Sequence, residues 1–296
     1  MRPKLFDEFP VSKIFHRRRF ILGSLIGATV AVVILLAATT GCSLGPTETR
    51  EDSFIVAGSS RVVVNSVNGN IEINAGLGNE VLVQATLRDA PKVKYELSQV
   101  GNTIIVDVQT SKRWWIFGSA GVDVTITVPP ETDVELDTSN GFIELHGLEG
   151  SGSLNSSNGK IVLDNMRGNF EGRTSNGRIE VNAVEGSVIL KTSNGKIDVR
   201  DVQGEFDVES SNGSVFYSGN MTAGGSNRLV TSNGDVVVEL QGKPSVVLDA
   251  ETSNGEVTSE LPILATVTRK ERLVGKIGEG EADLYIRTSN GDITIR

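Results

Sequence analysis

The sequence predicts an all-β protein, a β-solenoid similar to a parallel β-helix or β-roll, with an 18-residue coil made of two nonapeptide strand-turn units. Glycine recurs every nine residues from Gly141 to Gly213, and a Thr/Ser-Ser-Asn-Gly step recurs every eighteen. Apolar residues also sit two apart inside each unit. A fixed period is the signature of a repeat architecture, and alternation indicates short strands with one buried face.

The alternating pairs identify the expected interior. They are Ile161/Leu163, Ile179/Val181, Val188/Leu190, Ile197/Val199 and Phe206/Val208. Asn-Gly between two strands is also a strong signal for a hairpin, so an antiparallel meander is the alternative. A meander would leave one broad apolar face without cover, since the sequence offers no amphipathic helix. Stacked two-strand coils cover themselves, about 4.8 Å apart with the two sheets about 10 Å apart.

In such a stack, residues eighteen apart lie above one another. The sequence therefore predicts a structural turn ladder of asparagines, with members Asn140, Asn158, Asn176, Asn194 and Asn212. Ladders of this kind satisfy polar groups at the corners. The glycine after each asparagine is expected to adopt positive φ and to let the chain turn tightly. This motif is assigned to architecture, not to ligand binding.

The chain divides into three expected parts: a targeting segment or membrane anchor at 1–42, a linker at 43–52 and the solenoid at 53–296. Within the solenoid we expect degenerate coils at 53–130 and regular coils at 131–261. A loop insertion at 262–280 and a final coil at 281–296 would follow. Terminal repeats are often atypical in such proteins.

The first residues have the pattern of an export signal. Three consecutive arginines, 17–19, precede an uncharged stretch at 20–40 that is long enough to span a bilayer. Lipidation of Cys42, the only cysteine, and an uncleaved transmembrane helix both remain open. Either would anchor the solenoid to the cell membrane on its extracytoplasmic side, in the periplasm or at the cell surface, because positive charge stays in the cytoplasm.

Charge and residue types narrow the chemistry. The net charge is −9, and beyond residue 41 there are 22 basic against 35 acidic residues, which argues against nucleic-acid binding. The two histidines are His16, in the targeting segment, and His146, alone on an expected outward strand position, so no His-based catalytic triad, metal site or cofactor is expected. On the outside of the solenoid we expect a column of carboxylates beside a column of cations, and together these side chains should form a mixed, solvated surface. A polysaccharide-active enzyme on a β-helix is the remaining, disfavoured catalytic alternative.

One segment departs from the repeat. Residues 111–118 contain Trp114, Trp115 and Phe117 beside two cations, in an expected irregular loop. Exposed aromatic and basic side chains suit a binding surface for a sugar, the membrane interface or a protein partner. The alternative is that these aromatic rings cap the open core of the solenoid.

A family resemblance rests on the regular Thr/Ser-Ser-Asn-Gly steps, on Val-Thr-Ile-Thr-Val-Pro-Pro from Val124 and on Gly-Glu-Gly-Glu-Ala-Asp-Leu-Tyr-Ile-Arg from Gly278. In these features the chain resembles the bacterial putative-adhesin family of β-strand-repeat envelope proteins. That family is catalogued as a domain of unknown function. The resemblance covers most of residues 52–296 and implies the fold and a non-enzymatic adhesion or surface-display role, with a cell-surface polysaccharide or envelope protein as partner. An envelope sensor or scaffold acting through a membrane protein partner is the alternative.

Overall fold

The computed structural model describes residues 46–110 and 120–296, which form two β-sheets. In spatial order, sheet A contains β1 (Glu48–Ile55), β4 (Glu80–Arg88), β7 (Gly121–Val128), β3 (Ile71–Ala75), β9 (Ile143–His146), β11 (Ile161–Arg167), β13 (Ile179–Glu185), β15 (Ile197–Gln203), β17 (Val215–Gly219), β19 (Val236–Leu240), β25 (Ile293–Ile295) and β21 (Val257–Ser259).

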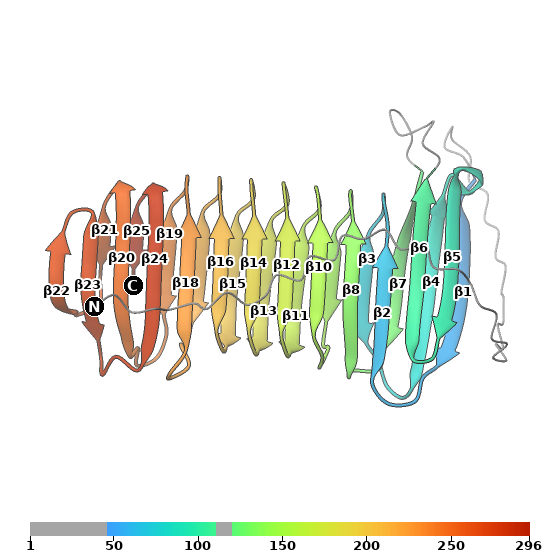
Figure 1. Ribbon diagram of the computed structural model, residues 1–296, viewed down its shortest axis with the longest axis horizontal. Helices are drawn as coiled ribbons and strands as arrows, with labels where there is room; N and C mark the ends of the chain where they lie inside the picture. Colours follow the sequence, from blue (N-terminus) through green and yellow to red (C-terminus); the bar gives the residue numbers. More distant parts are fainter. Residues whose placement is uncertain (1–45, 111–119) are drawn as a thin grey trace. The chain divides into compact units, whose positions relative to one another are not determined.

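Sheet B lies against sheet A across the core (Figure 1). In spatial order it contains β5 (Val93–Val100), β6 (Thr103–Thr110), β2 (Ser60–Asn65), β8 (Thr132–Thr138), β10 (Gly152–Ser156), β12 (Phe170–Thr174), β14 (Val188–Thr192), β16 (Phe206–Ser210), β18 (Ser226–Thr231), β24 (Ala282–Asn290), β20 (Val246–Asn254), β23 (Arg272–Ile277) and β22 (Leu264–Arg269). A short 3-10 turn, η1 (Ala90–Lys92), precedes β5.

Each coil consists of one strand from sheet B followed by one from sheet A, and strands pair in parallel with their counterparts in the neighbouring coils. Leu154 of β10 aligns with Gly172 of β12, and Ile161 of β11 aligns with Ile179 of β13, an offset of eighteen residues in both sheets. The expected solenoid is confirmed, since a meander would pair each strand antiparallel with the next strand in sequence.

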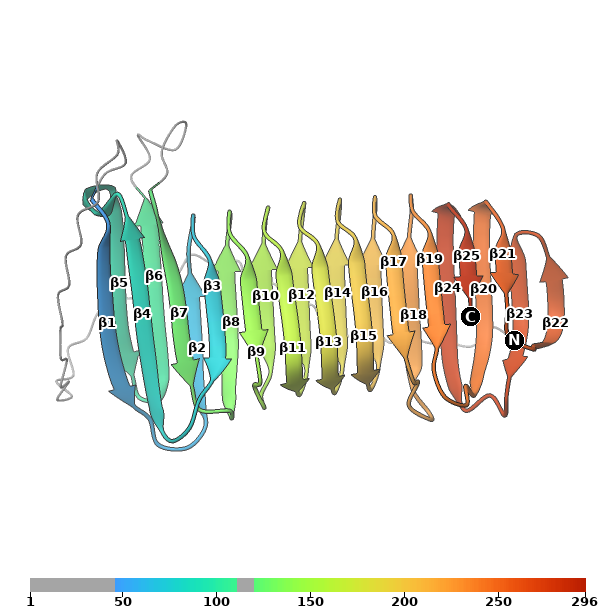
Figure 2. The ribbon, with the colours of Figure 1, turned by 180° about the vertical axis from the view of Figure 1, so that it is seen from behind.

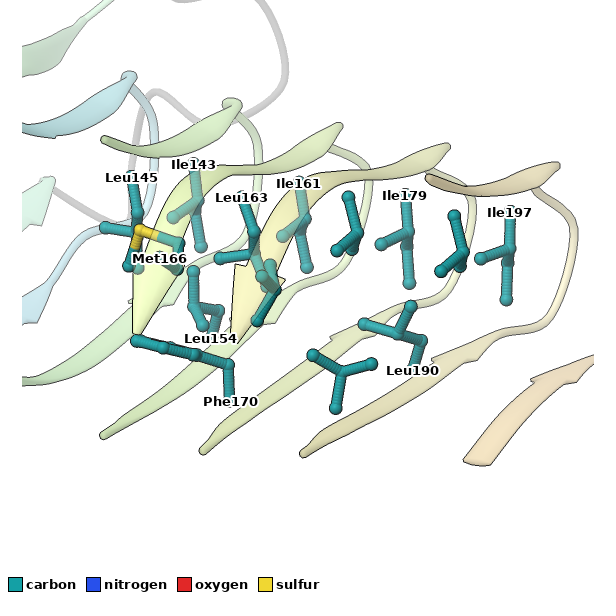
Figure 3. Packing of buried hydrophobic residues seen from close by; sticks show 14 of the residues in the cluster. Ile143, Leu145, Leu154, Ile161, Leu163, Met166, Phe170, Ile179, Leu190 and Ile197 are labelled. Carbon is teal, nitrogen blue, oxygen red and sulfur yellow. The ribbon is translucent and has the colours of Figure 1, made fainter. Parts of the chain in front are cut away.

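Inward side chains from the two sheets form one continuous apolar core, of which Figure 3 shows a section. Isoleucines Ile143, Ile161, Ile179 and Ile197 stack in a column on sheet A and are fully buried. Leu154, Phe170 and Leu190 face them from sheet B. Because every coil contributes the same few positions to this interior, the core continues from coil to coil with no domain break.

The corner glycines serve a different purpose from the one expected. Gly159, Gly177, Gly195 and Gly213 are outside the left-handed region of φ. They are required because a Cβ on each would overlap the carbonyl oxygen of the glycine in the adjacent coil. The backbones of successive coils therefore approach too closely at this corner for any side chain.

The spatial order of the coils departs from the sequence order toward both ends (Figures 1 and 2). The coil of β6 and β7 lies outside the earlier coil of β2 and β3. The coil of β24 and β25, expected to be last, lies between the coil of β18 and β19 and the coil of β20 and β21. The last coil in sequence is thus an internal layer of the stack.

Antiparallel strands flank the parallel coils at both ends. At one end β4 pairs with β7, β1 with β4 and β5 with β6 in antiparallel fashion. At the other end, the segment expected as a loop insertion contains β22 and β23, a hairpin in which β23 pairs antiparallel with β20. The parallel repeat therefore ends at strands of opposite direction.

The close approach at the corner predicts a large effect of one methyl group. Gly177→Ala should destabilise the protein by about 3 kcal/mol, because the new Cβ has no room beside the Gly159 carbonyl group. Gly172→Ala is the matched control, since its Cβ would meet the nearest atom, Cδ2 of Leu190, at an ordinary 3.4 Å. Urea unfolding monitored by circular dichroism compares the two, and equal midpoints would contradict this explanation.

Candidate binding surface

The predicted asparagines lie in one column at the corner, and their side chains are joined by hydrogen bonds. Each Nδ2 donates to the Oδ1 of the asparagine in the adjacent coil over 2.7–2.9 Å. In spatial order the column contains Asn68, Asn140, Asn158, Asn176, Asn194, Asn212, Asn233, Asn290 and Asn254. All amides point the same way, so their polar groups are engaged with one another.

Beneath this column, buried hydroxyl groups join adjacent corners. Thr174 Oγ1 donates to the carbonyl oxygen of Gly159 over 3.1 Å and accepts the backbone N–H of Gly177 over 3.1 Å. The same position in other coils is serine or threonine and makes the same contact. The Thr/Ser-Ser-Asn-Gly step is therefore occupied by structural bonds and offers little to a ligand.

Two sets of predicted functional residues fall outside the part of the chain that the structure describes. They are the lipidation candidate Cys42 and the aromatic residues Trp114, Trp115 and Phe117. Among the described residues, no helix is long and apolar enough to span a bilayer.

Titratable side chains also lie on the outer face of sheet A. His146 lies on the outer face of sheet A, with its Nδ1 3.6 Å from a carboxylate oxygen of Asp164. Within residues 46–110 and 120–296, no three His, Cys, Asp or Glu side chains are grouped so as to hold a metal ion.

The outer face of sheet B carries a hollow of 340 Å³ where the strands begin. It spans five coils, from Arg61 of β2 to Ile189 of β14, and arises from short side chains. Ser153 of β10 lies between the longer Glu135 of β8 and Glu171 of β12, and Ser151 immediately precedes β10. Ile189 adds an apolar wall and is 41% exposed. The hollow is thus a dip in a regular sheet, in which Val134, Phe170 and Ile189 supply apolar surface between polar and charged side chains.

The inward residue of the same coil is also small. Gly152 occupies the position held by Val134 and Phe170 in the adjacent coils. A Cβ there would lie 2.7 Å from Cγ2 of Val134 and 2.9 Å from the ring of Phe170, so the neighbouring side chains already fill its space. Both faces at the start of β10 therefore carry small residues, and the hollow has Phe170 in its wall.

A second hollow, of 420 Å³, lies at the other end of these strands and extends over β10 to β16. The residues that line it are polar or charged and include Asn155, Arg173, Lys191 and Glu209, with serines from the following turns, and the aliphatic parts of these side chains contribute apolar surface as well. Lys191 Nζ lies 3.6 Å from a carboxylate oxygen of Glu209. The two hollows share β10, β12 and β14, so one extended ligand could contact both.

Charges on this face are balanced by close pairing. Arg61 contacts Glu135 at 2.5 Å, Arg173 contacts Glu171, and Arg228 contacts Asp207 at 2.7 Å. Burial is the main factor that raises the pKa of the nearby Asp137 carboxyl group, with a smaller opposing effect from its hydrogen bond to Asn155. We call this surface the sheet B face; it presents mixed donors and acceptors with little net charge.

Sequence reasoning missed the sheet B face because it depends on comparing one column of residues across coils. The available signal was the run Gly150-Ser-Gly-Ser153, where neighbouring coils have larger residues at the same positions. Such a run also suits an ordinary loop, so only the register shows that its serines form the floor of a hollow.

Comparison with known proteins identifies the family. The family profile described as Toastrack DUF4097 matches residues 59–296, and the chain belongs to that family. No protein of curated function matches the sequence.

Among solved structures, the chain is similar to a putative adhesin from Bacteroides fragilis, with 13% identity and a TM-score of 0.50, over 84% of this chain and 97% of that one. A putative adhesin from Parabacteroides distasonis shares 13% identity with a TM-score of 0.43, over 83% and 96% of the two chains. A putative lipid binding protein from the same species shares 16% identity with a TM-score of 0.38, over 84% and 97%. At 13% identity, the first of these likenesses supports the solenoid fold alone.

The asparagine column predicts a dependence on position. Asn176→Ala removes two amide–amide hydrogen bonds and should lower the free energy of unfolding by about 2 kcal/mol, whereas Asn254→Ala at the end of the column removes one and should cost about 1 kcal/mol. Thermal and urea unfolding of the two variants would test this. Equal effects, or none, would show that the column contributes little to stability.

Proposed function

We propose that this Toastrack DUF4097 protein is a membrane-tethered, extracytoplasmic and non-enzymatic binding module that holds a surface polysaccharide on the sheet B face. The observation that carries the proposal is the pair of hollows over β8–β16, which are open and lined mainly by serine, asparagine and paired charged side chains. Sugars carry many hydroxyl groups that both donate and accept hydrogen bonds, and these side chains match that property.

Rigidity of the surface also favours this role. Most residues that line the hollows lie on, or next to, strands whose backbones are bonded on both sides to adjacent coils. A surface already held in its binding geometry loses little conformational freedom when a ligand binds, which improves affinity. A regular series of coils also offers successive contacts to a polymer with repeating units, so several weak contacts can add up.

The proposal is tested by filling the first hollow. Ser153→Phe should reduce the affinity of the full chain for a bound polysaccharide by at least about tenfold, equivalent to about 1.4 kcal/mol, because the ring occupies the floor. Binding would be measured by biolayer interferometry against immobilised neutral and weakly charged polysaccharides, including dextran, galactomannan and peptidoglycan fragments. Thr125→Phe is the matched control, since Thr125 lies on the outer face of sheet A.

Two results would contradict the proposal. One is failure of every polysaccharide in the panel to bind the unaltered chain. The other is an equal loss of affinity in the Ser153 and Thr125 variants, which would indicate a general effect of an added ring. A membrane protein recovered by cross-linking at the sheet B face, with no polysaccharide bound, would support the sensor or scaffold alternative.

The tether is a separate part of the proposal. We expect Cys42 to carry a diacylglyceryl group after cleavage of residues 1–41, because small residues precede it. Intact-mass spectrometry of chain purified from membranes should then show loss of the first 41 residues and addition of lipid. An intact Met1 would instead support an uncleaved anchor. Cys42→Ser should leave the precursor uncleaved, and an unchanged mass relative to the unaltered chain would contradict lipidation.

A further inference from the structure

The outer face of sheet A carries a local group of cations that the polysaccharide proposal does not use. We call it the basic stripe; its members are Lys160, Arg178, Lys196 and Arg200, from the three successive coils that contain β11, β13 and β15. Lys160, Arg178 and Lys196 hold the same position in each coil, immediately before the strand. The stripe therefore runs across the strands, from coil to coil.

Two carboxylates lie within the stripe and are shared among its cations. Glu180 accepts contacts from Lys160 at 2.6 Å and Arg178 at 3.0 Å. Asp198 is contacted by Arg200 at 2.9 Å, Arg178 at 3.3 Å and Lys196 at 3.6 Å. The four cations of the stripe outnumber the two carboxylates that they contact, while Asp164 of β11 and Asp201 of β15 add negative charge on the same strands. The net charge of the chain is −9.

The cations are more exposed than the two carboxylates that they contact. The side chains of the four cations are 41–52% exposed, whereas that of Glu180 is 31% exposed and that of Asp198 is 8% exposed. This part of the outer face therefore mixes both signs of charge, with Asp198 nearly covered.

An aromatic ring further restricts two of these cations. The guanidinium carbon of Arg200 lies 4.6 Å from the ring centroid of Phe216, and Nζ of Lys196 lies 5.7 Å from it. Such contacts hold a cation in place through the negative face of the ring. Because exposed ion pairs add little to stability, about 0–1 kcal/mol each, folding alone does not account for a group of ordered cations.

From these observations we propose that the basic stripe binds a linear polymer that carries repeated phosphate groups. Arginine forks and lysine ammonium groups both bind phosphate oxygens. Cations in successive coils recur about every 4.8 Å, which places regularly spaced positive charges opposite the regularly spaced negative charges of such a polymer. The site is distinct from the sheet B face, so it can fail without affecting that proposal.

Acidic residues limit the stripe at both ends. In the coil before the stripe, Glu144 aligns with Val162. After the stripe, Asp235 lies next to Ser214 of the preceding coil. Asp164 lies to one side and accepts a hydrogen bond from Asn182 over 2.7 Å. Because charges more than about 8 Å away are largely screened at physiological salt, the remaining negative charge of the protein does not prevent contact at the stripe. We therefore expect a short segment of polymer to bind.

The test uses the full chain in non-ionic detergent, with long-chain sodium polyphosphate as probe and orthophosphate for comparison. Isothermal titration calorimetry at about 50 mM NaCl should show binding of polyphosphate, much weaker binding of orthophosphate, and weakening at about 200 mM NaCl. The double variant Lys160→Gln/Lys196→Gln should lose roughly five- to tenfold in affinity. It keeps Arg178 and Arg200, which contact Asp198.

The matched control is Arg173→Gln/Lys191→Gln, which removes the same charge from the sheet B face. This variant should change the affinity for polyphosphate by less than about twofold. Arg173 and Lys191 lie on the opposite sheet, so salt screens their charges from a ligand bound at the basic stripe. Equal losses in the two double variants would overturn the proposal and indicate diffuse attraction. Absence of polyphosphate binding at low salt would overturn it as well. Unchanged melting temperatures would confirm that each variant is folded.

Discussion

The close approach of successive backbones at one corner is the constraint on which the rest of the structure depends. There, each glycine faces the carbonyl oxygen of the glycine one coil away, with no room for a Cβ. This contact fixes the offset between coils at eighteen residues wherever no loop intervenes. Once the offset is fixed, every other position along the coil is aligned with its counterparts, and columns of like residues follow.

Three kinds of column then have different structural roles. The inward columns of isoleucine, valine and leucine bury apolar surface continuously, which supplies the main favourable free energy. At the corner, asparagine amides and buried hydroxyl groups satisfy polar atoms that neither sheet can pair. The outward columns neither fill the core nor satisfy the polar atoms of the corner, so their residues can vary from coil to coil. It is in these outward columns that the sheet B face and the basic stripe occur.

The fold could be predicted from the sequence to the extent that the repeat is regular. The period gave the parallel pairing of β10–β17 and the inward position of Ile161, Ile179 and Ile197. Local turn preference gave the wrong reason for the glycines, because proximity to another coil is invisible in a nonapeptide. The covering of Asp198 and the hollow above Ser153 could not be foreseen either. Both depend on the sizes of side chains in adjacent coils.

The internal position of the coil that contains β24 and β25 has a consequence for how the protein is made. The strands β20 and β21 emerge first from the ribosome or export channel, yet the partners on which they stack come later in the chain. Growth by adding one parallel layer at a time must therefore stop after β19, and until β24 arrives β20 can pair only with the antiparallel hairpin of β22 and β23. Completion is a concerted step, in which a late segment enters between two earlier ones and the surface exposed on β18 and β19 is covered. The open edges of β18 and β19, which could otherwise accept a strand from another molecule, thus persist during synthesis and are covered in the finished protein.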